Sequence, residues 1–403
     1  MDNGLYRLIG RIQNYAWGGH EFIPKLLGLH PEPHTPYAEY WLGAHETAPS
    51  RIVLEDSKTV RLNRFIAEYP RLALGPRVAL QYGRLPYLLK VLDVEKPLSI
   101  QVHPSKSEAK VGFARENELR IPLDSPKRNY KDDNHKPELM VALSDFWLLH
   151  GFLPEAELSN VLRDVPEFRV LRGVFENGGY AGLYKHVMNM PSEEVDAILE
   201  PLAKRIRIKG ETDRLEESSA DFWMARIVAD RNTNQYDRGV FSIYFLNLVC
   251  LRRGQAIFQD AGVPHAYLQG QNIEVMANSD NVLRGGLTEK HVDVPELLRT
   301  VRFEGICPEA IEGTLMDNPL EAYYESPAQD FRPSRIHLEI GDIYVNSTQS
   351  VEIVLIMNGE AAIDSGTKHI SLSRGQSAVV FAETTYQMTA LSENATLFRV
   401  SIP

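Results

Sequence analysis

The sequence predicts a mainly β protein in which a helical segment interrupts a body of antiparallel barrels or sandwiches. Three observations lead to this fold class. Short β-rich runs cut by Gly and Pro fill residues 1–150, apolar residues take a helical spacing within 151–235, and alternating runs return from Val240 onward. A change of the hydrophobic period from two to about 3.6 residues marks the change from strands to helices.

The N-terminal part is expected to form strands. The run SRIVL ends at Leu54, YLLKVLDV surrounds Val91, and PLSIQVH ends at His103. Runs of this length between turn residues are typical of antiparallel barrels and sandwiches. We therefore assign residues 1–150, together with residues 236–320, to one discontinuous β domain.

The middle of the chain is expected to be helical. Leu158, Leu162 and Val165 recur at a helical spacing behind an acidic start. Ser192 precedes two glutamates and a second apolar stripe, so it is expected to cap another helix whose first turn is acidic. Residues 151–235 are therefore predicted to form a helical insertion into the β body.

The C-terminal part, residues 321–403, is expected to form a second β domain. Four glycines between residues 341 and 375 separate several short alternating runs. Evenly spaced short strands of this kind favour a barrel or a jelly roll. Only His337 and His369 are available as imidazole ligands from Ile336 to the end, so we expect no metal site in this domain.

The overall composition excludes several classes of protein. The chain has 403 residues, with 43 Lys and Arg against 54 Asp and Glu and a net charge of −11, so it lacks the basic excess of a nucleic-acid binder. Two cysteines, Cys250 and Cys307, exclude a disulfide framework and suggest a reducing compartment. The first residues do not form a signal peptide, and no window reaches the roughly 18 apolar residues of a membrane span. We expect a cytoplasmic protein without a membrane partner.

Three short segments carry residues that could bind a metal ion. SIQVHP places Gln101 and His103 two residues apart on a predicted strand, so both side chains leave the same face. DDNHKPELMVAL contains Glu138, and AGVPHAYLQG contains His265. Each residue alone is better explained by packing or by a solvated loop than by metal binding. Together they offer two imidazoles, a carboxylate and an amide oxygen, a set that suits Zn²⁺, although Mn²⁺, Fe²⁺ or Co²⁺ could use the same ligands.

The same segments resemble the motif series of the type I mannose-6-phosphate isomerases, a family of the cupin superfamily. QVHP, NHKPEL, AGVPHAYLQG and SDNVLRGGLTEKHVDV occur in that order, and NYAWGG, YAEYWLGAH and PYLLKVLDVEKPLS match the same family. The resemblance runs from about Gln13 to Phe303. It implies cupin-type jelly-roll barrels: a catalytic metal-binding domain over 1–150 and 236–320, the helical insertion, and a cupin-like domain over 321–403 without a metal site.

The resemblance also implies roles for particular residues. One zinc ion per chain would be held by Gln101, His103, Glu138 and His265, and the essential arginine of the family falls on Arg284. Substrate contacts fall on Trp17, Glu39, Lys90, Lys136, Glu274 and Arg284. The residues Lys90, Ser99, Lys136, Arg284 and Lys290 could form a cationic pocket for a phosphate group, which charge-assisted hydrogen bonds hold well. Tyr267 is expected to pack rather than to take part in chemistry. Gly285, where the family commonly has a small residue such as Ala, is expected to loosen the backbone beside Arg284.

The reaction implied is the reversible interconversion of mannose 6-phosphate and fructose 6-phosphate. It requires ring opening, removal of the proton on carbon 2, an enediol intermediate and reprotonation at carbon 1. Zn²⁺ would polarise the oxygens on carbons 1 and 2. Lys136 and Glu274 are both candidates for the proton-transfer base. Arg284 would either stabilise the enediolate or clamp the phosphate, and the sequence does not separate these roles.

Three alternatives stay open from the sequence. One is a non-catalytic cupin that senses or stores a sugar, and another is an isomerase that acts on unphosphorylated sugars. The third is a metal-dependent cupin oxygenase or epimerase. Non-haem iron oxygenases usually use two histidines and one carboxylate, so Gln101 as a fourth ligand and the clustered cations argue against it. We expect a monomer that acts on a small phosphorylated sugar.

Overall fold

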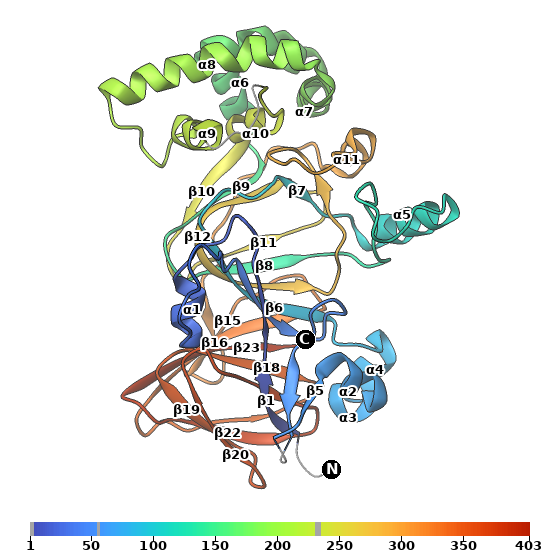
Figure 1. Cartoon of the computed structure of the whole chain (residues 1–403), viewed down its shortest axis with the longest axis vertical. Coiled ribbons are helices and arrows are strands. Elements are labelled where there is room, and N and C mark those ends of the chain that lie inside the picture. The colour runs from blue at the N-terminus through green and yellow to red at the C-terminus, as the bar shows by residue number, and fades with distance from the viewer. Residues whose placement is uncertain (1–3, 55–56, 230–234) are drawn as a thin grey trace.

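The chain stacks a helical region, a central β region and a C-terminal β region one above another (Figure 1). The computed structural model describes residues 4–54, 57–229 and 235–403. Within the described residues, all neighbouring strands pair in the antiparallel sense, as expected for jelly-roll barrels. Examples are β12 with β6 and β16 with β23. The predicted fold class, cupin-type barrels with a helical insertion, is confirmed, although helices cover about as much of the chain as strands do.

The central region is a ten-stranded sheet that curves around a buried interior. Its strands are β2 (Arg11–Gln13), β3 (Glu39–Gly43), β6 (Tyr87–Val94), β7 (Gln101–Val102), β8 (Glu138–Ala142), β9 (Phe146–Phe152), β10 (Leu246–Leu251), β11 (Ala256–Gln259), β12 (His265–Ala277) and β13 (Leu283–Arg284). β12 joins its two halves, because residues 270–277 pair with β6 while residues 265–269 pair with β9. This long strand therefore runs through the whole central region.

Helices cover one end of the central region. They are α6 (Glu155–Asp164), the 3-10 helix η1 (Pro166–Leu171), α7 (Arg172–Asn189), α8 (Ser192–Thr212), α9 (Ala220–Ala229) and α10 (Gly239–Phe245). Leu158 and Leu162 are fully buried, as their spacing predicted. Ser192 is the first residue of α8 rather than its cap, because the extended Pro191 takes the capping position without a side-chain hydrogen bond. The predicted end of the insertion at residue 235 stays a prediction, because residues 230–234 lie outside the described part. Helix α10 follows this boundary in the sequence.

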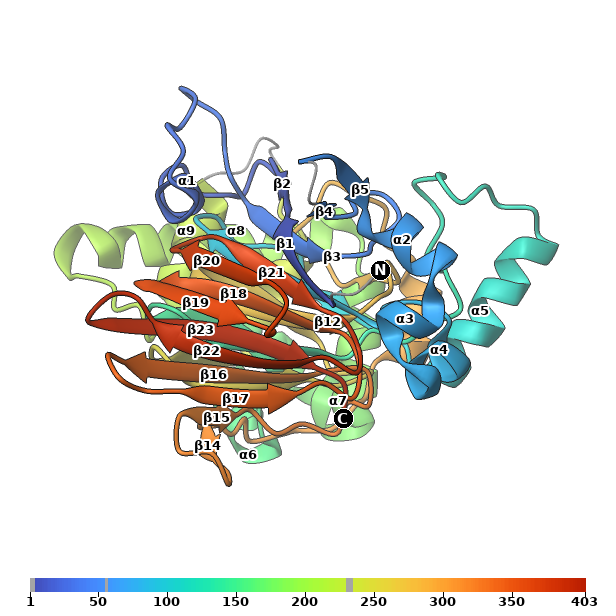
Figure 2. The same ribbon diagram turned by 90° about the horizontal axis from the view of Figure 1, so that it is seen from below.

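The C-terminal region contains two further sheets. One has the order β14 (Thr314–Leu315), β15 (Glu321–Tyr323), β16 (Arg332–Glu339), β23 (Asn394–Ser401), β18 (Glu352–Asn358), β21 (Ser377–Val380), β1 (Leu5–Ile9), β4 (Arg51–Val53) and β5 (Thr59–Arg61). The other is β17 (Tyr344–Ser347), β22 (Thr385–Ala390), β19 (Glu360–Asp364) and β20 (His369–Ser373). In Figure 2 the orange and red strands from β16 to β23 have roughly aligned axes. β1 pairs with the C-terminal strand β21, and β4 and β5 extend the same sheet beyond β1, so the predicted N-terminal domain shares its first strands with the C-terminal one.

The remaining helices lie along the flanks of the β regions. They are α1 (Phe22–Leu27), α2 (Leu62–Glu68), α3 (Pro70–Leu74), α4 (Pro76–Tyr82), α5 (Lys106–Glu118) and α11 (Val294–Thr300). α5 begins with a complete capping box, in which the Ser105 hydroxyl accepts from the Glu108 backbone N–H and the Glu108 carboxylate accepts from the Ser105 backbone N–H. The helix therefore starts at a fixed point just after β7.

A single hydrophobic cluster spans the central and C-terminal regions. It includes Leu89 and Val91 of β6 together with Phe398 and Val400 of β23, all nearly or fully buried. The Tyr87 hydroxyl, also buried, donates a hydrogen bond of 2.9 Å to the Val400 carbonyl. The C-terminal region therefore supports the back of the strand that carries Lys90.

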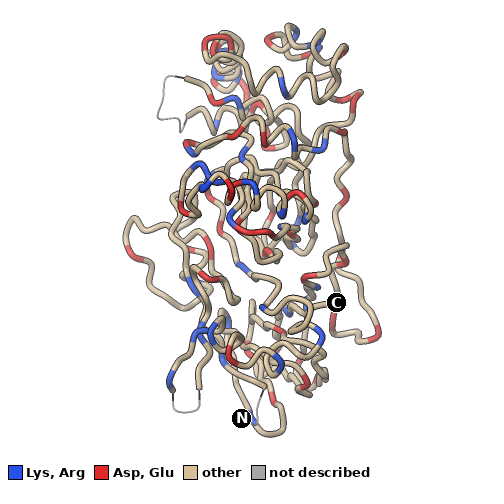
Figure 3. Tube along the Cα trace, turned by 90° about the vertical axis from the view of Figure 1, so that its right-hand side faces the viewer, with Lys and Arg blue, Asp and Glu red and all other residues tan. Residues whose placement is uncertain are grey.

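Charged residues of both signs are interspersed along the trace in Figure 3, so the sign of the charge does not set one region apart. Within the described part of the chain, no helix combines the length and the apolar composition that a membrane crossing needs.

Candidate metal centre and active site

Three buried side chains that could hold a metal ion meet inside the central region. His103, Glu138 and His265 follow or belong to β7, β8 and β12, and their possible ligand atoms all lie within 4.8 Å of one another. The Nε2 atoms of His103 and His265 lie 3.4 and 3.5 Å from the two carboxylate oxygens of Glu138. Among the described residues this is the one group of three or more His, Cys, Asp or Glu side chains with that property.

The hydrogen bonds of the two imidazoles determine which nitrogen is free. His103 Nδ1 lies 2.9 Å from the Asn281 carbonyl, and His265 Nδ1 lies 2.9 Å from the Val263 carbonyl. A carbonyl only accepts, so each Nδ1 carries the proton and each Nε2 directs a lone pair toward Glu138. Burial, reinforced by the charge of Lys136, lowers the pKa of His103 to about 4, which keeps it neutral.

This arrangement calls for a cation. Two lone pairs facing one carboxylate repel it unless a positive ion lies between them, and His103 Nε2 is buried with no hydrogen-bond partner in the described part of the chain. Gln101 pairs directly with His265 across β7 and β12 and lines the adjoining cavity, so its amide oxygen is available as a fourth donor. A neutral-imidazole, carboxylate and amide set fits zinc, and hydrogen bonds from Nδ1 to carbonyls are the usual support of zinc-binding histidines.

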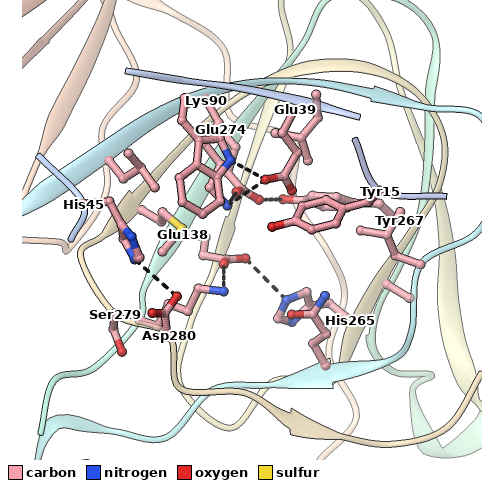
Figure 4. A pocket seen from close by; sticks show the side chains of 18 residues that line it. Tyr15, Glu39, His45, Lys90, Glu138, His265, Tyr267, Glu274, Ser279 and Asp280 are labelled. Carbon is pink, nitrogen blue, oxygen red and sulfur yellow. Dashed lines mark hydrogen bonds and ion pairs between the residues drawn. The ribbon is translucent and has the colours of Figure 1, made fainter. Parts of the chain in front are cut away.

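A cavity of about 170 Å³ opens beside these residues (Figure 4). Its wall carries a buried charge network, in which Lys90 Nζ lies 2.9 Å from Glu274 and 3.8 Å from Glu39. The Tyr267 hydroxyl donates to Glu274 at 3.0 Å, and the Trp41 indole donates to Glu39. Nearer the imidazoles, Lys136 Nζ lies 3.0 Å from Glu138.

Burial and neighbouring charges shift these groups from their ordinary pKa values. Burial acts to lower the pKa of Lys90, but Glu274 and Glu39 outweigh it and raise that pKa, so Lys90 stays charged. Burial raises the pKa of Glu274, although Lys90 acts the other way. Burial also opposes ionisation of Glu138, yet the charge of Lys136 helps to hold its pKa well below the usual range. The carboxylate next to the imidazoles is therefore ionised.

Strand register explains why residues distant in sequence meet here. Lys90 stands opposite Glu274 on β12 and opposite Trp41 on β3, and directly opposed residues of antiparallel strands share one face. Glu39 lies two residues from Trp41, so it also faces the cavity. The alternation that buries the hydrophobic residues on one face thus gathers the charged ones on the other.

The structure brings together seven of the predicted site residues on the cavity wall: Glu39, Lys90, Gln101, Lys136, Glu138, His265 and Glu274. His103 lies beside them. Trp17 and Ser99 do not line this cavity. Trp17 lines a separate cavity of about 720 Å³ below the insertion helices, and it stacks at 5.9 Å on Tyr15, which does line the first.

Of the two remaining predicted residues, Arg284 stands beside the site, opposite Gln101, and Lys290 follows six residues later in the sequence. Arg284, on β13, stands opposite Gln101 of β7, and its side chain makes no hydrogen bond or ion pair with another residue of the described part. Burial lowers the pKa of Arg284. Burial also lowers the pKa of Lys290, and the charges of Arg284 and Lys131 lower it further. The charges of Arg284 and Lys131 thus act on Lys290.

Gly285 does not act as predicted. A methyl group added there would lie 2.7 Å from the Tyr184 hydroxyl and 2.9 Å from Ile100 Cγ2. Glycine therefore lets the insertion helix α7, through Tyr184, pack closely behind Arg284 instead of loosening the backbone. A larger residue would require these neighbours to move.

Several residues of the cavity were not predicted. Tyr267 packs in a hydrophobic cluster, as expected, and its hydroxyl also donates to Glu274 on the cavity wall; its spacing of two residues from His265 was the available signal for this second contact. His45 Nε2 lies 3.2 Å from Asp280 Oδ1, and both residues line the cavity. Tyr15, Trp41 and Ser279 are further unpredicted wall residues.

The fold and the site define a metal-binding barrel protein with a small, strongly charged cavity. A family model described as phosphomannose isomerase type I, catalytic domain, matches residues 5–155. Mannose-6-phosphate isomerase from Shigella flexneri is 36% identical, over 94% of this chain and 95% of its own length. The mouse enzyme of the same name is 33% identical over 90% of each.

Solved structures agree with this relationship. Mannose 6-phosphate isomerase from Salmonella typhimurium, bound to substrate and a zinc atom, has a TM-score of 0.87 and 34% identity, and the match covers 99% of each chain. A zinc-bound holo form matches with the same values. The chain belongs to the type I phosphomannose isomerase family, as the motif series predicted.

Proposed function

We propose that this protein is a zinc-dependent aldose–ketose isomerase that interconverts mannose 6-phosphate and fructose 6-phosphate. The observation that carries the proposal is the pair of imidazole lone pairs directed at the Glu138 carboxylate, at the edge of a cavity lined by Lys90, Lys136 and Glu274. Relatives over most of the chain are named for this reaction.

The zinc ligands in this proposal are Gln101, His103, Glu138 and His265, with one ion per chain. When bound, zinc supplies a Lewis acid that polarises oxygens on carbons 1 and 2 of the sugar. The imidazoles are held in the required tautomer by the Asn281 and Val263 carbonyls. We place no metal in the C-terminal domain, and we expect the working unit to be a monomer.

Proton transfer between carbons 1 and 2 needs a group that can take and return a proton within hydrogen-bond reach of the sugar. We propose that Lys136 or Glu274 performs it through an enediol. Both side chains are buried and line the cavity, and each is ion-paired with a second buried group, Glu138 or Lys90. Glu39 and Lys90, on the same wall, would bind and orient sugar hydroxyls.

The phosphate needs cations that are not already neutralised. The charges of Arg284 and Lys131 both act on Lys290, and the Arg284 side chain has no anionic partner among the described residues. A dianionic phosphate would neutralise these positive charges. The planar guanidinium of Arg284 offers a pair of donors for the phosphate oxygens. Because Arg284 also stands opposite Gln101, stabilisation of enediolate charge is a second role that fits its position. The proposal keeps substrate contacts for Ser99 and for Trp17, which stacks on the cavity residue Tyr15.

The decisive experiment is a coupled assay of mannose 6-phosphate conversion on chelator-stripped protein, with and without added Zn²⁺. We expect activity to disappear on stripping and to return with zinc, and we expect unphosphorylated mannose to be a far poorer substrate. Folded protein that binds zinc but converts neither sugar would contradict the isomerase and favour a sugar-binding protein. Equal turnover of the two sugars would contradict the phosphate site.

The proton-transfer assignment is tested by Lys136→Met and Glu274→Gln, with zinc content measured for each. A general base typically contributes about 10²–10⁴-fold. At least one variant should lose turnover by that factor while keeping its zinc. If both retain near-wild-type turnover, the assignment is wrong.

A further inference from the structure

Two loops that carry site residues are tied together by a dense set of hydrogen bonds. The first loop, residues 131–134, leads into Lys136 and Glu138 on β8. The second, residues 278–281, connects the end of β12 to β13 and Arg284. They are about 150 positions apart in the sequence (for example Lys131 to Asn281), so only the fold brings them together.

Asn281 is the centre of this contact. It is fully buried, and its side-chain oxygen accepts the backbone N–H of Lys131 at 2.7 Å and of Asp132 at 3.2 Å. Its amide nitrogen donates to the backbone carbonyls of Asp132 and Asn134, each at 2.8 Å. The oxygen and the nitrogen of the Asn281 side chain thus form all of these hydrogen bonds with the first loop.

Asp132, in the first loop, forms hydrogen bonds with the second loop. Its carboxylate accepts the backbone N–H of Asp280 at 2.8 Å and the hydroxyl of Ser279 at 2.8 Å. The same carboxylate accepts the Asn134 backbone N–H at 2.9 Å, which folds its own loop. We call Asp132, Ser279 and Asn281 the inter-loop clasp.

The clasp also reaches the candidate metal centre. The backbone carbonyl of Asn281 accepts the Nδ1–H of His103 at 2.9 Å, the contact that leaves His103 Nε2 facing Glu138. One residue therefore fixes the tautomer and orientation of a predicted ligand through its main chain, and fixes the loop ahead of Lys136 through its side chain.

We propose that the inter-loop clasp is a positioning unit for the metal centre, which sets the direction of His103 and the place of the Lys136 loop at the same time. The inference rests on the proposed function for the identity of the ion. Groups that support a metal-binding imidazole typically change metal affinity by about 10–100-fold when removed. None of the three clasp residues needs to touch metal or sugar for this effect.

The test measures zinc affinity in folded protein by competition with a chelating dye, together with backbone amide exchange in the zinc-free state. Asn281→Ala should weaken zinc binding by about 10–100-fold and speed the exchange of the Lys131, Asp132 and Asp280 amides. Ser279→Ala removes one hydroxyl but leaves the Asn281 side-chain amide in place. It should therefore weaken zinc binding and speed amide exchange less than Asn281→Ala does. It replaces Asn281→Ala in the test if that variant does not fold.

Asn346→Ala is the matched control. Asn346 lies in the C-terminal region, where its amide donates to Glu352 and Tyr386. It should lower the unfolding temperature and leave zinc affinity unchanged. The proposal is overturned if Asn281→Ala loses stability as this control does, yet binds zinc like the wild type. If the wild type binds no zinc, it is the proposed function that fails. In that case, unchanged amide exchange in Asn281→Ala would separately contradict the proposal that the clasp positions the Lys136 loop.

Discussion

The central and C-terminal regions both bury charged side chains within β-structure, but they partner them differently. In the C-terminal region, Arg399 is 3% exposed and donates to Glu321 at 2.8 Å, to Glu352 at 2.5 Å and to the Tyr323 hydroxyl at 2.8 Å. Tyr344 donates to Glu321, and Tyr386 donates to Glu352. Every member of this cluster has its partners inside the protein.

The central region leaves the same kinds of groups incomplete. Two imidazole lone pairs face one carboxylate, and Arg284 has no partner in the described part of the chain. The comparison teaches that buried charge alone does not indicate a site. What distinguishes a site is buried charge whose partners are missing, because a ligand or an ion can supply them.

The largest effect is expected from breaking the saturated cluster. Arg399→Met leaves Glu321 and Glu352 as uncompensated buried carboxylates, so the free energy of unfolding should fall by about 3–5 kcal/mol in urea denaturation. Adding Glu321→Gln and Glu352→Gln should restore part of the loss. The folded fraction should keep its zinc affinity, and a parallel loss of zinc affinity would show that the two regions are not separate.

Zinc removal should lower the free energy of unfolding by less than Arg399→Met does. With free zinc about 100-fold above its dissociation constant, binding should add about 2.7 kcal/mol to the free energy of unfolding. Calorimetry of stripped and loaded protein measures this difference. Glu138→Gln should abolish it, whereas Arg399→Met should leave it unchanged because distant sites act additively. A zinc-dependent shift that survives Glu138→Gln would place the ion elsewhere.

Arg284→Met should change catalysis and leave stability almost unaltered. A cation without a partner among the described residues contributes little to folding, so the free energy of unfolding should change by no more than about 0.5 kcal/mol. The lost charge-assisted hydrogen bond to substrate, about 1.5–3 kcal/mol, should lower kcat/KM by roughly 10–150-fold. A rise in KM alone assigns Arg284 to the phosphate, and a fall in kcat assigns it to the enediolate. Arg205→Met, which breaks the paired contact with Glu167 in the insertion, should leave the kinetics unchanged.

The smallest effect is expected for a matched pair of tyrosines. Tyr267→Phe and Tyr344→Phe each remove a hydroxyl that donates to a buried glutamate, Glu274 or Glu321. Each loss is worth about 1 kcal/mol. For Tyr267 it should appear as a roughly fivefold lower turnover, and for Tyr344 as lower stability without a kinetic change. Reversal of the two outcomes would contradict the comparison.

The sequence predicted the parts of the site that local patterns encode. Gln101 and His103 were found because two residues on a strand share a face, and the helical insertion because its period differs from that of its flanks. His45 and Asp280 were not found, although both lie within recognised motifs, because no local spacing relates residues brought together only by the fold. Gly285 was misread for the same reason: its constraint comes from Tyr184 of a distant helix.

The pairing of β1 with β21 has a consequence for synthesis. Leu5 lies opposite Val380, so β1, which pairs with the nearby β4 along one edge, finds the partner for its other edge only when nearly the whole chain has been made. Until then its edge is open to other strands, which is the condition in which nascent β proteins associate wrongly. Completion of the fold should therefore be slow and late, and C-terminal truncations should be lost to aggregation before any effect on the active site is seen.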